Sequence, residues 1–463
     1  MSLFAHRPGT LFLLIFTIAY FLGLAAALVW LRLGPEYILA LTVGAIGIVV
    51  MAFRPYVAIQ IFLLVLFFEN AVGKAGNITV MKALGVIILA GWLASIMMQR
   101  RIGVSRSALL IAMLCFLAWA GVCVLGALDA RIGLVQFVSF AQLVLSAIMF
   151  NSVVRSLRHL RGVQIGFLAW TVVATLVAIA MYYAGATRVA VGFVGNRNLL
   201  AIYINLGIVC ALLTLPTIRS RLGQLAIALS LPILFLGMAL TLSRTGIVIM
   251  ILALLVVWYR LARHQGLLVL LGSATALAGL VFLLPGAFWE RTESIVPTIE
   301  RREDTFGVRV RIWEVGFRMI EDRPIMGVGP GNFAPASPRY ARGEIMIRGL
   351  TAHNAYISAA AEMGLVGLGA FLTIIALGLM NCRRAFRRAR DQGDRGLALG
   401  ALAVEMMIWV MLGQGLTADF VQLKCFWLLL GLSLALHGLT SPLAAAAVAH
   451  AAAARTAPAT ANA

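Results

Sequence analysis

The feature that most constrains this chain is a series of apolar runs, most of them long enough to cross a bilayer as a helix. A water-soluble fold could not bury so much apolar surface, because hydrophobic residues make up 62% of the chain and charged residues only 12%. The runs predict an all-α, polytopic integral membrane protein with about 12–14 transmembrane helices. The candidate spans are 10–31, 36–53, 55–69, 80–99, 107–127, 132–152, 163–184, 198–216, 222–242, 245–259, 266–284, 355–380, 397–418 and 421–438.

The placement of basic residues predicts how these spans are oriented. The chain has 37 Lys and Arg against 17 Asp and Glu, a net charge of +20. If the N-terminus is cytoplasmic and the spans alternate, most basic residues of the short loops fall on the cytoplasmic side, where such residues are retained. Membrane orientation therefore explains the charge, and nucleic acid is not expected as a partner.

Four regions follow from this pattern. Transmembrane helices are expected in residues 1–284, one large periplasmic loop in 285–353, and further transmembrane helices in 354–438. The Ala-rich cytoplasmic tail, 439–463, is expected to be disordered.

The large loop has its own predicted organisation. Residues 307–324 are expected to form an amphipathic helix that ends at Pro324 and lies at the membrane surface. The stretch GVGPGNF, residues 327–333, predicts a turn, because no strand–helix–strand unit surrounds it as a dinucleotide-binding loop requires. None of the five cysteines lies in this loop, so neither a disulfide framework nor a metal site is predicted.

One histidine stands where this loop meets an apolar run, in GLTAHNAYISAAAEMGLVGLGAF, residues 349–371. His353 is the one histidine of six that the orientation places on the periplasmic side. As an ordinary loop residue it would bind a backbone group at the span boundary. As a general base it would take a proton from a hydroxyl, since an unperturbed histidine has a pKa near ~6.5. Asn354 could orient the histidine or the substrate.

Several arginines are expected on the same side of the membrane. Arg244, in TLSRTG, has almost no loop around it, so it is either a boundary anchor or an anion clamp that binds phosphate oxygens bidentately. Arg188 and Arg197 lie in the glycine-bearing stretch ATRVAVGFVGNRNLLAIYI, residues 186–204. They are ordinary loop residues, or Arg188 joins Arg244 at one anionic group.

Most of the remaining candidate residues also have two possible roles. Asn196 and Asn198 could cap the next helix. Arg309 and Arg311, near the start of the loop helix, are either solvated charges or ligands. Glu405 falls inside a span, where a carboxyl is either functional or paired with a neighbouring span. Asp419 is expected at an outward span end.

One histidine together with several arginines suits a substrate that already carries an anionic leaving group. A sugar linked to a lipid diphosphate is such a substrate. The arginines would hold the diphosphate and stabilise its charge as it departs. The histidine would deprotonate the acceptor hydroxyl.

These residues resemble the O-antigen ligase and O-antigen polymerase superfamily of bacterial envelope glycosyltransferases. The strongest match is His353-Asn354, nine residues and then GLVG at 364–367, which is similar to the ligase pattern of histidine, a small polar residue, nine positions and G-x-x-G. PIMGVGPGNF, RVAVGFVGNRN and SRTG also resemble family landmarks, in the family's order, so the similarity spans roughly residues 186–370. Leu368 departs from many ligases, which have Thr or Val there, and the motif does not separate ligase from polymerase.

The resemblance implies an inverting-type enzyme that moves a glycan from undecaprenyl diphosphate to a lipid A–core acceptor at the periplasmic face of the bacterial inner membrane. Membrane lipids would surround it, and neither metal, nucleotide nor other cofactor is implied. Alternatives are an O-antigen or exopolysaccharide polymerase, a protein O-oligosaccharyltransferase and a transporter of lipid-linked glycans. Carried over by position, the general base would be His353, the diphosphate-binding residues Arg188, Arg244, Arg309 and Arg311, and the supporting residues Asn354, Arg197 and Asn198.

Overall fold

The computed structural model describes residues 35–68, 74–75, 78–99, 107–185, 194, 196–265, 305–342 and 349–441. The chain separates into two compact units, Met1–Gly103 and Val104–Ala463, which are considered one at a time. The expected spans at 10–31 and 266–284 and nearly all of the expected disordered tail lie outside the described residues.

The described residues of the first unit form three helices and one short hairpin. Its helix α2 packs against α4, and α3 also packs against α4. Proline starts both α2 and α3, at a position where the missing backbone N–H has no helical partner to lose. The two strands pair antiparallel and are the only strands in the part of the chain described. The elements are α2 (Pro35–Phe53), α3 (Pro55–Phe68), β1 (Lys74–Ala75), β2 (Ile78–Thr79) and α4 (Val80–Gln99).

The second unit is a helical bundle, and most of its described helices correspond to expected spans. Polar residues just before several helices accept hydrogen bonds from their first N–H groups, as Asp129 does from Arg131 and Ile132. The helices are α5 (Ala108–Leu125), α6 (Ala130–Val153), α7 (Leu157–Tyr183), α8 (Arg197–Thr214), α9 (Arg221–Thr241), α10 (Arg244–Gln265), α14 (Thr305–Asp322), α15 (Phe333–Tyr340), α16 (Ala355–Asp391), α17 (Arg395–Gln414) and α18 (Lys424–Leu439).

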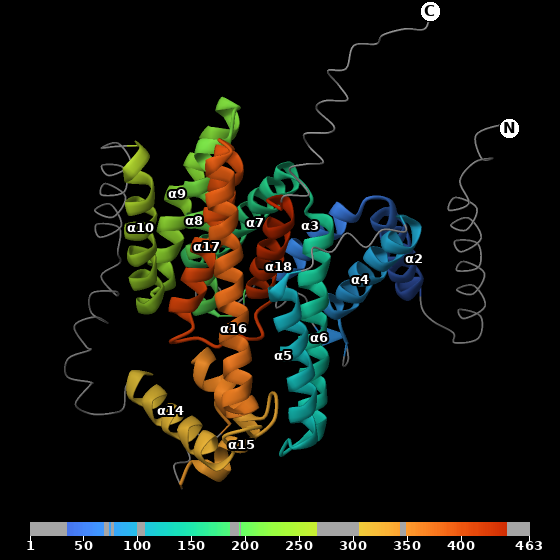
Figure 1. Cartoon of the computed structure of the whole chain (residues 1–463), viewed down its shortest axis with the longest axis vertical. Coiled ribbons are helices and arrows are strands. Elements are labelled where there is room, and N and C mark those ends of the chain that lie inside the picture. The colour runs from blue at the N-terminus through green and yellow to red at the C-terminus, as the bar shows by residue number, and fades with distance from the viewer. Residues whose placement is uncertain are drawn as a thin grey trace, which may run out of the picture. The chain divides into compact units, whose positions relative to one another are not determined.

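Helices α8 and α17 form the centre of this bundle (Figure 1). They pack against each other, and α17 also contacts α7, α10, α16 and α18. Both are apolar around most of their circumference, which is the pattern of a helix enclosed by others. Seven of the described helices are long and apolar enough to cross a membrane, and four shorter apolar helices accompany them. The predicted all-α, polytopic fold is confirmed for the described residues.

A small second core joins the loop helices to the bundle. The helix expected at 307–324 is α14, and its buried Ile312, Val315 and Met319 pack with Phe333 of α15 and Ile357 of α16. Its apolar face therefore contacts protein, although Phe317 is exposed. Figure 1 shows α14 and α15 together at one end of the unit, beside the start of α16.

Candidate active site

The spacing of the histidine motif corresponds to one short helix. Asn354 is the N-cap of α16, and its Oδ1 accepts hydrogen bonds from the N–H groups of Tyr356 (3.0 Å) and Ile357 (3.1 Å). The helix then runs for nine residues, 355–363, before Gly364 interrupts it with a φ of 70°. The predicted single span from 355 is thus two segments, 355–363 and 365–391, because the backbone at Gly364 is not helical.

Only glycine fits at this interruption. A Cβ on Gly364 would collide with the carbonyl oxygen of Ile325, and its positive φ disfavours any side chain. A Cβ on Gly367 would collide with Met363 at the end of the first segment. Gly364 therefore permits the close approach of the Ile325 backbone at the break, and Gly367 leaves room for the side chain of Met363.

The GVGPGNF stretch is the turn that docks on this break. Gly327, Gly329 and Gly331 all have positive φ, as a tight turn requires. The N–H of Val328 donates to Ala361 O (2.8 Å), and the N–H of Gly329 donates to Glu362 O (2.9 Å). These bonds satisfy carbonyl groups that the end of the first segment would otherwise leave unpaired.

His353 is held in an uncommon backbone conformation immediately before the capped helix. Its φ is 48°, in the left-handed region that few residues other than glycine adopt. The indole N–H of Trp313, on α14, donates to the carbonyl oxygen of Ala352 (3.1 Å) and so fixes the preceding residue. The imidazole is half-buried.

Its surroundings favour the neutral form of the imidazole. Burial lowers the pKa of His353 from its ordinary value, and the nearby positive charge of Arg309 lowers it further. Arg309 lies on the half-buried part of α14. A neutral imidazole with a guanidinium close by can accept a proton next to an anionic group.

A second group of candidate residues gathers where α8 and α10 begin. The Oγ of Ser243 donates to Oδ1 of Asn198 (3.1 Å) and also accepts the N–H of Gly246 in the first turn of α10. Arg197 and Arg244 are the first residues of α8 and α10, and both side chains are exposed. Two helix N-termini, each with a positive dipole end and an arginine, make this a favourable place for an anion.

Contacts along α17 show that the candidate histidine and this group lie at the same end of the bundle. Tyr356, on the first segment of α16, donates its hydroxyl to Leu412 O (2.9 Å) near the end of α17. There, Gly413 faces α10 so closely that a Cβ added to it would lie 2.6 Å from Cδ1 of Ile249. Ile249 is five residues, or ~7.5 Å, along the helix from Arg244. This end of the second unit is called the histidine end below.

The other candidates occupy distinct positions. Arg188 lies outside the described residues. Arg311 is two residues beyond Arg309, which places it on another face of α14. Besides capping α16, Asn354 donates its Nδ2 to Leu416 O (3.3 Å), so it ties α16 to the chain after α17.

The structure also reveals a pocket of about 420 Å³ beside the first segment of α16, with both polar and apolar residues in its wall. Buried Glu362 lies in its wall and accepts the N–H groups of Gly331 (2.8 Å) and Phe333 (3.3 Å). Asp419, in the same wall, accepts the hydroxyl of Ser358 (2.6 Å). Burial raises the pKa of Asp419, and the bond from Ser358 opposes the rise.

Thr351, which lies two residues before His353 in the chain, also lines this pocket. Gln136 and Gln422 add amide groups to the wall. The apolar periodicity around Glu362 gives no sign of this role. An acidic residue inside an apolar run was the only signal, and the partners that turn it into a pocket wall come from distant segments.

One comparison with known proteins connects these residues to a family. A family model described as O-antigen ligase matches residues 229–372, from α9 through the break in α16. The matched segment contains Arg244, Arg309, Arg311 and the whole histidine motif. No curated protein matches the chain.

Proposed function

We propose that this chain, which its segment 229–372 places in the O-antigen ligase superfamily, transfers a glycan from undecaprenyl diphosphate to a lipid A–core acceptor. Membership of this superfamily implies a membrane glycosyltransferase that acts on lipid-linked glycans. The donor, the acceptor and the periplasmic location of the reaction are parts of the proposal.

In the proposed reaction, His353 acts as the general base. A ring nitrogen takes the proton from an acceptor hydroxyl, and the hydroxyl oxygen attacks the anomeric carbon of the donor. The bond from that carbon to the diphosphate oxygen breaks, and the diphosphate leaves with the bonding electrons. Attack opposite to the leaving group inverts the anomeric configuration. The proton remains on the imidazolium until solvent removes it.

The arginines would stabilise the leaving diphosphate. Arg197 begins α8 and Arg244 begins α10, and these two N-termini are adjacent. Arg309 lies close enough to His353 to lower the pKa of the histidine. We assign diphosphate binding to Arg244 and Arg309, with Arg188 and Arg311 as further candidates and Asn198 as the residue that holds the α8–α10 junction. Fixed charges at this place stabilise the transition state without reorganising.

The pocket beside the first segment of α16 suits the acceptor. Its wall offers carboxyl, amide and hydroxyl groups, which are the groups that bind sugar hydroxyls. It begins two residues from His353, so an acceptor sugar bound there could present a hydroxyl to the imidazole.

The observation that carries the proposal is the half-buried imidazole of lowered pKa at the histidine end, with arginines on α8, α10 and α14 at the same end. A direct test combines the purified full chain with undecaprenyl diphosphate-linked glycan and lipid A–core in detergent. The expected result is glycosylated lipid A–core together with free undecaprenyl diphosphate.

Other products would identify the alternatives. Longer lipid-linked glycans formed without lipid A–core would assign the chain as a polymerase, and glycan on a protein acceptor would assign an O-oligosaccharyltransferase. A chain that forms no glycosidic bond but moves the donor across vesicle membranes would be a transporter, and the proposed function would be wrong.

A further inference from the structure

An apolar groove of about 580 Å³ runs along the bundle between α10 and α17. Tyr356 and Leu416 line it at the histidine end. Apolar side chains of α10 and α17 line its length, including Leu252, Val256 and Met406. Arg260 and Arg383 line its other end, which is called the arginine end below.

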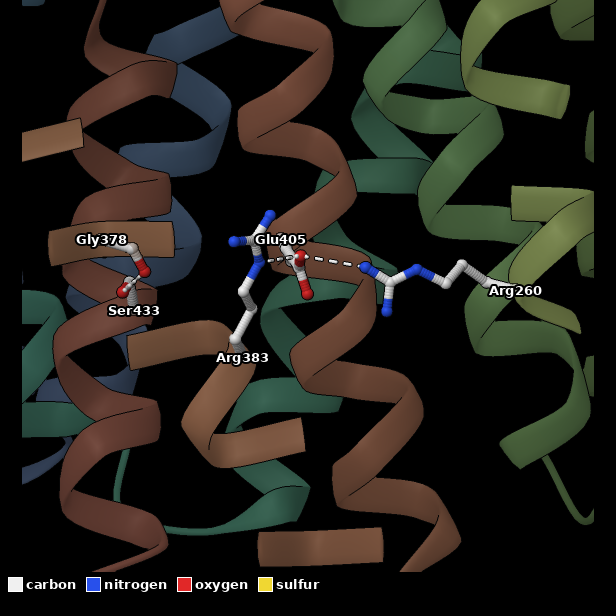
Figure 2. A network of polar contacts seen from close by, with 5 residues as sticks. All are labelled: Arg260, Gly378, Arg383, Glu405 and Ser433. Atoms are coloured by element: carbon white, nitrogen blue, oxygen red, sulfur yellow. Dashed lines mark hydrogen bonds and ion pairs between the residues drawn. The ribbon is translucent and has the colours of Figure 1, made fainter. Parts of the chain in front are cut away.

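At the arginine end, one carboxylate stands between two guanidinium groups (Figure 2). Glu405 of α17 is fully buried, and its Oε1 contacts Nε of Arg383 (2.9 Å) and Nη2 of Arg260 (3.4 Å). The guanidinium of Arg383 also lies over the ring of Trp409, 5.8 Å from its centroid. The sequence left open whether Glu405 is a functional carboxyl or is paired with a neighbouring span. In the structure it is paired with arginines of two neighbouring helices, α10 and α16.

The cluster is not balanced in charge. Two guanidinium groups share one carboxylate, and among the described residues Glu405 is the only acidic partner of either. Their side chains are 34% and 46% exposed, so part of each guanidinium faces the groove. The excess positive charge at the end of an apolar groove favours an anion that would neutralise it.

The length of the groove limits what the anion is attached to. Ile249 and Arg260, at the two ends of the groove, are eleven positions apart on α10, which is ~16 Å of helix. That is about half of the ~30 Å hydrocarbon core, or one leaflet. An acyl chain lying in the groove would therefore extend through a single leaflet with its headgroup at the arginines.

From the charge and the length we infer that the groove binds one anionic phospholipid, with its phosphate at Arg260 and Arg383 and an acyl chain along α10 and α17. Basic pockets between transmembrane helices bind such headgroups. The donor of the proposed reaction fits this site poorly. Its diphosphate must reach His353, whereas the two arginines lie at the opposite end of the groove.

The test measures thermal stabilisation of the detergent-solubilised full chain as phosphatidylglycerol or phosphatidylcholine is added. The wild-type Tm should rise with phosphatidylglycerol and change little with zwitterionic phosphatidylcholine. Arg260→Gln leaves Arg383 and Glu405 as a neutral pair, so at least tenfold more phosphatidylglycerol should be needed for half of the rise. Glu405→Gln removes the carboxylate, so less should be needed than in the wild type, even though its Tm without lipid falls.

Three further substitutions separate lipid binding from folding. Val256→Trp fills the groove from an exposed position without changing any charge, and it should abolish the phosphatidylglycerol effect. Leu255→Trp, next to it but not in the groove, and Arg384→Gln, next to Arg383 but not in the groove, should both respond as the wild type does.

Three results would overturn the inference. Equal stabilisation of the wild type by both phospholipids would show no anionic preference. An unchanged phosphatidylglycerol response in Arg260→Gln, or in Val256→Trp if the first variant does not fold, would place the lipid elsewhere. Stabilisation by undecaprenyl phosphate but not by phosphatidylglycerol, lost in these same variants, would make the occupant a polyprenyl carrier.

Discussion

The indole N–H of Trp313 donates to the carbonyl oxygen of Ala352 across 3.1 Å, and so links α14 to the residue that precedes His353. Trp313→Phe keeps most of the ring and removes this bond. We expect the transfer rate to fall about tenfold, equivalent to about 1.4 kcal/mol, because the imidazole is less well positioned. Initial rates of the purified variant would measure this. Phe317→Leu, at an exposed position of the same helix, should keep the wild-type rate.

Arg309 sets part of the pH dependence. Burial and the charge of Arg309 both lower the pKa of His353, so the neutral base persists below the ordinary value of 6.5, and kcat/KM should fall only when the pH drops further. Arg309→Gln removes the repulsion and raises this pKa, so the acid limb of the kcat/KM profile should move to higher pH. Arg311→Gln is the control and should leave the limb in place. An unmoved limb in Arg309→Gln would separate Arg309 from the histidine.

The break in α16 requires a glycine at position 364. In Gly364→Ala the new Cβ would meet the carbonyl oxygen of Ile325 while the backbone keeps a positive φ. The free energy of unfolding should decrease by at least about 2 kcal/mol, seen as a lower Tm in detergent. Gly369→Ala, five residues along the same helix with nothing within 4 Å of the added Cβ, should be tolerated. Equal Tm values for the two variants would contradict this account of the motif.

Arg244 should need its planar fork as well as its charge. Arg244→Lys keeps a cation at the N-terminus of α10 but cannot bind two phosphate oxygens in parallel. The transfer rate should fall at least about tenfold while the Tm is unchanged. Arg221→Lys, at the start of α9, is the matched control. Unchanged kinetics in Arg244→Lys would indicate that Arg244 only anchors the helix.

The sequence predicted those parts of the molecule that depend on local pattern. Apolar runs gave helix positions, the amphipathic pattern gave α14, and the nine-residue spacing of the histidine motif reappears as the first segment of α16. The break itself could not be foreseen, because apolar residues continue through Gly364 and the colliding carbonyl belongs to Ile325. Helix α15 was also missed, since it contains prolines.

Contacts between distant segments could not be predicted either, because the pattern of one helix does not identify its partners on other helices. Glu405 meets Arg260 across 145 residues and Arg383 across 22, and neither partner follows from the pattern of its own helix. Glu362 likewise gains its role from Gly331 and Phe333 on a separate turn. Periodicity shows which face of a helix is apolar, but not which polar groups of other helices meet it.

The proposed mechanism depends on His353 as the general base, and the substitution His353→Ala removes this base. His437 is the matched control, because it is also half-buried but lies near the C-terminal end of α18, away from the histidine end. The measurement is the rate at which each purified variant forms glycosylated lipid A–core at pH 7.5. We expect a loss of at least about 100-fold for His353→Ala with an unchanged Tm, and a wild-type rate for His437→Ala. Wild-type transfer by His353→Ala would contradict it.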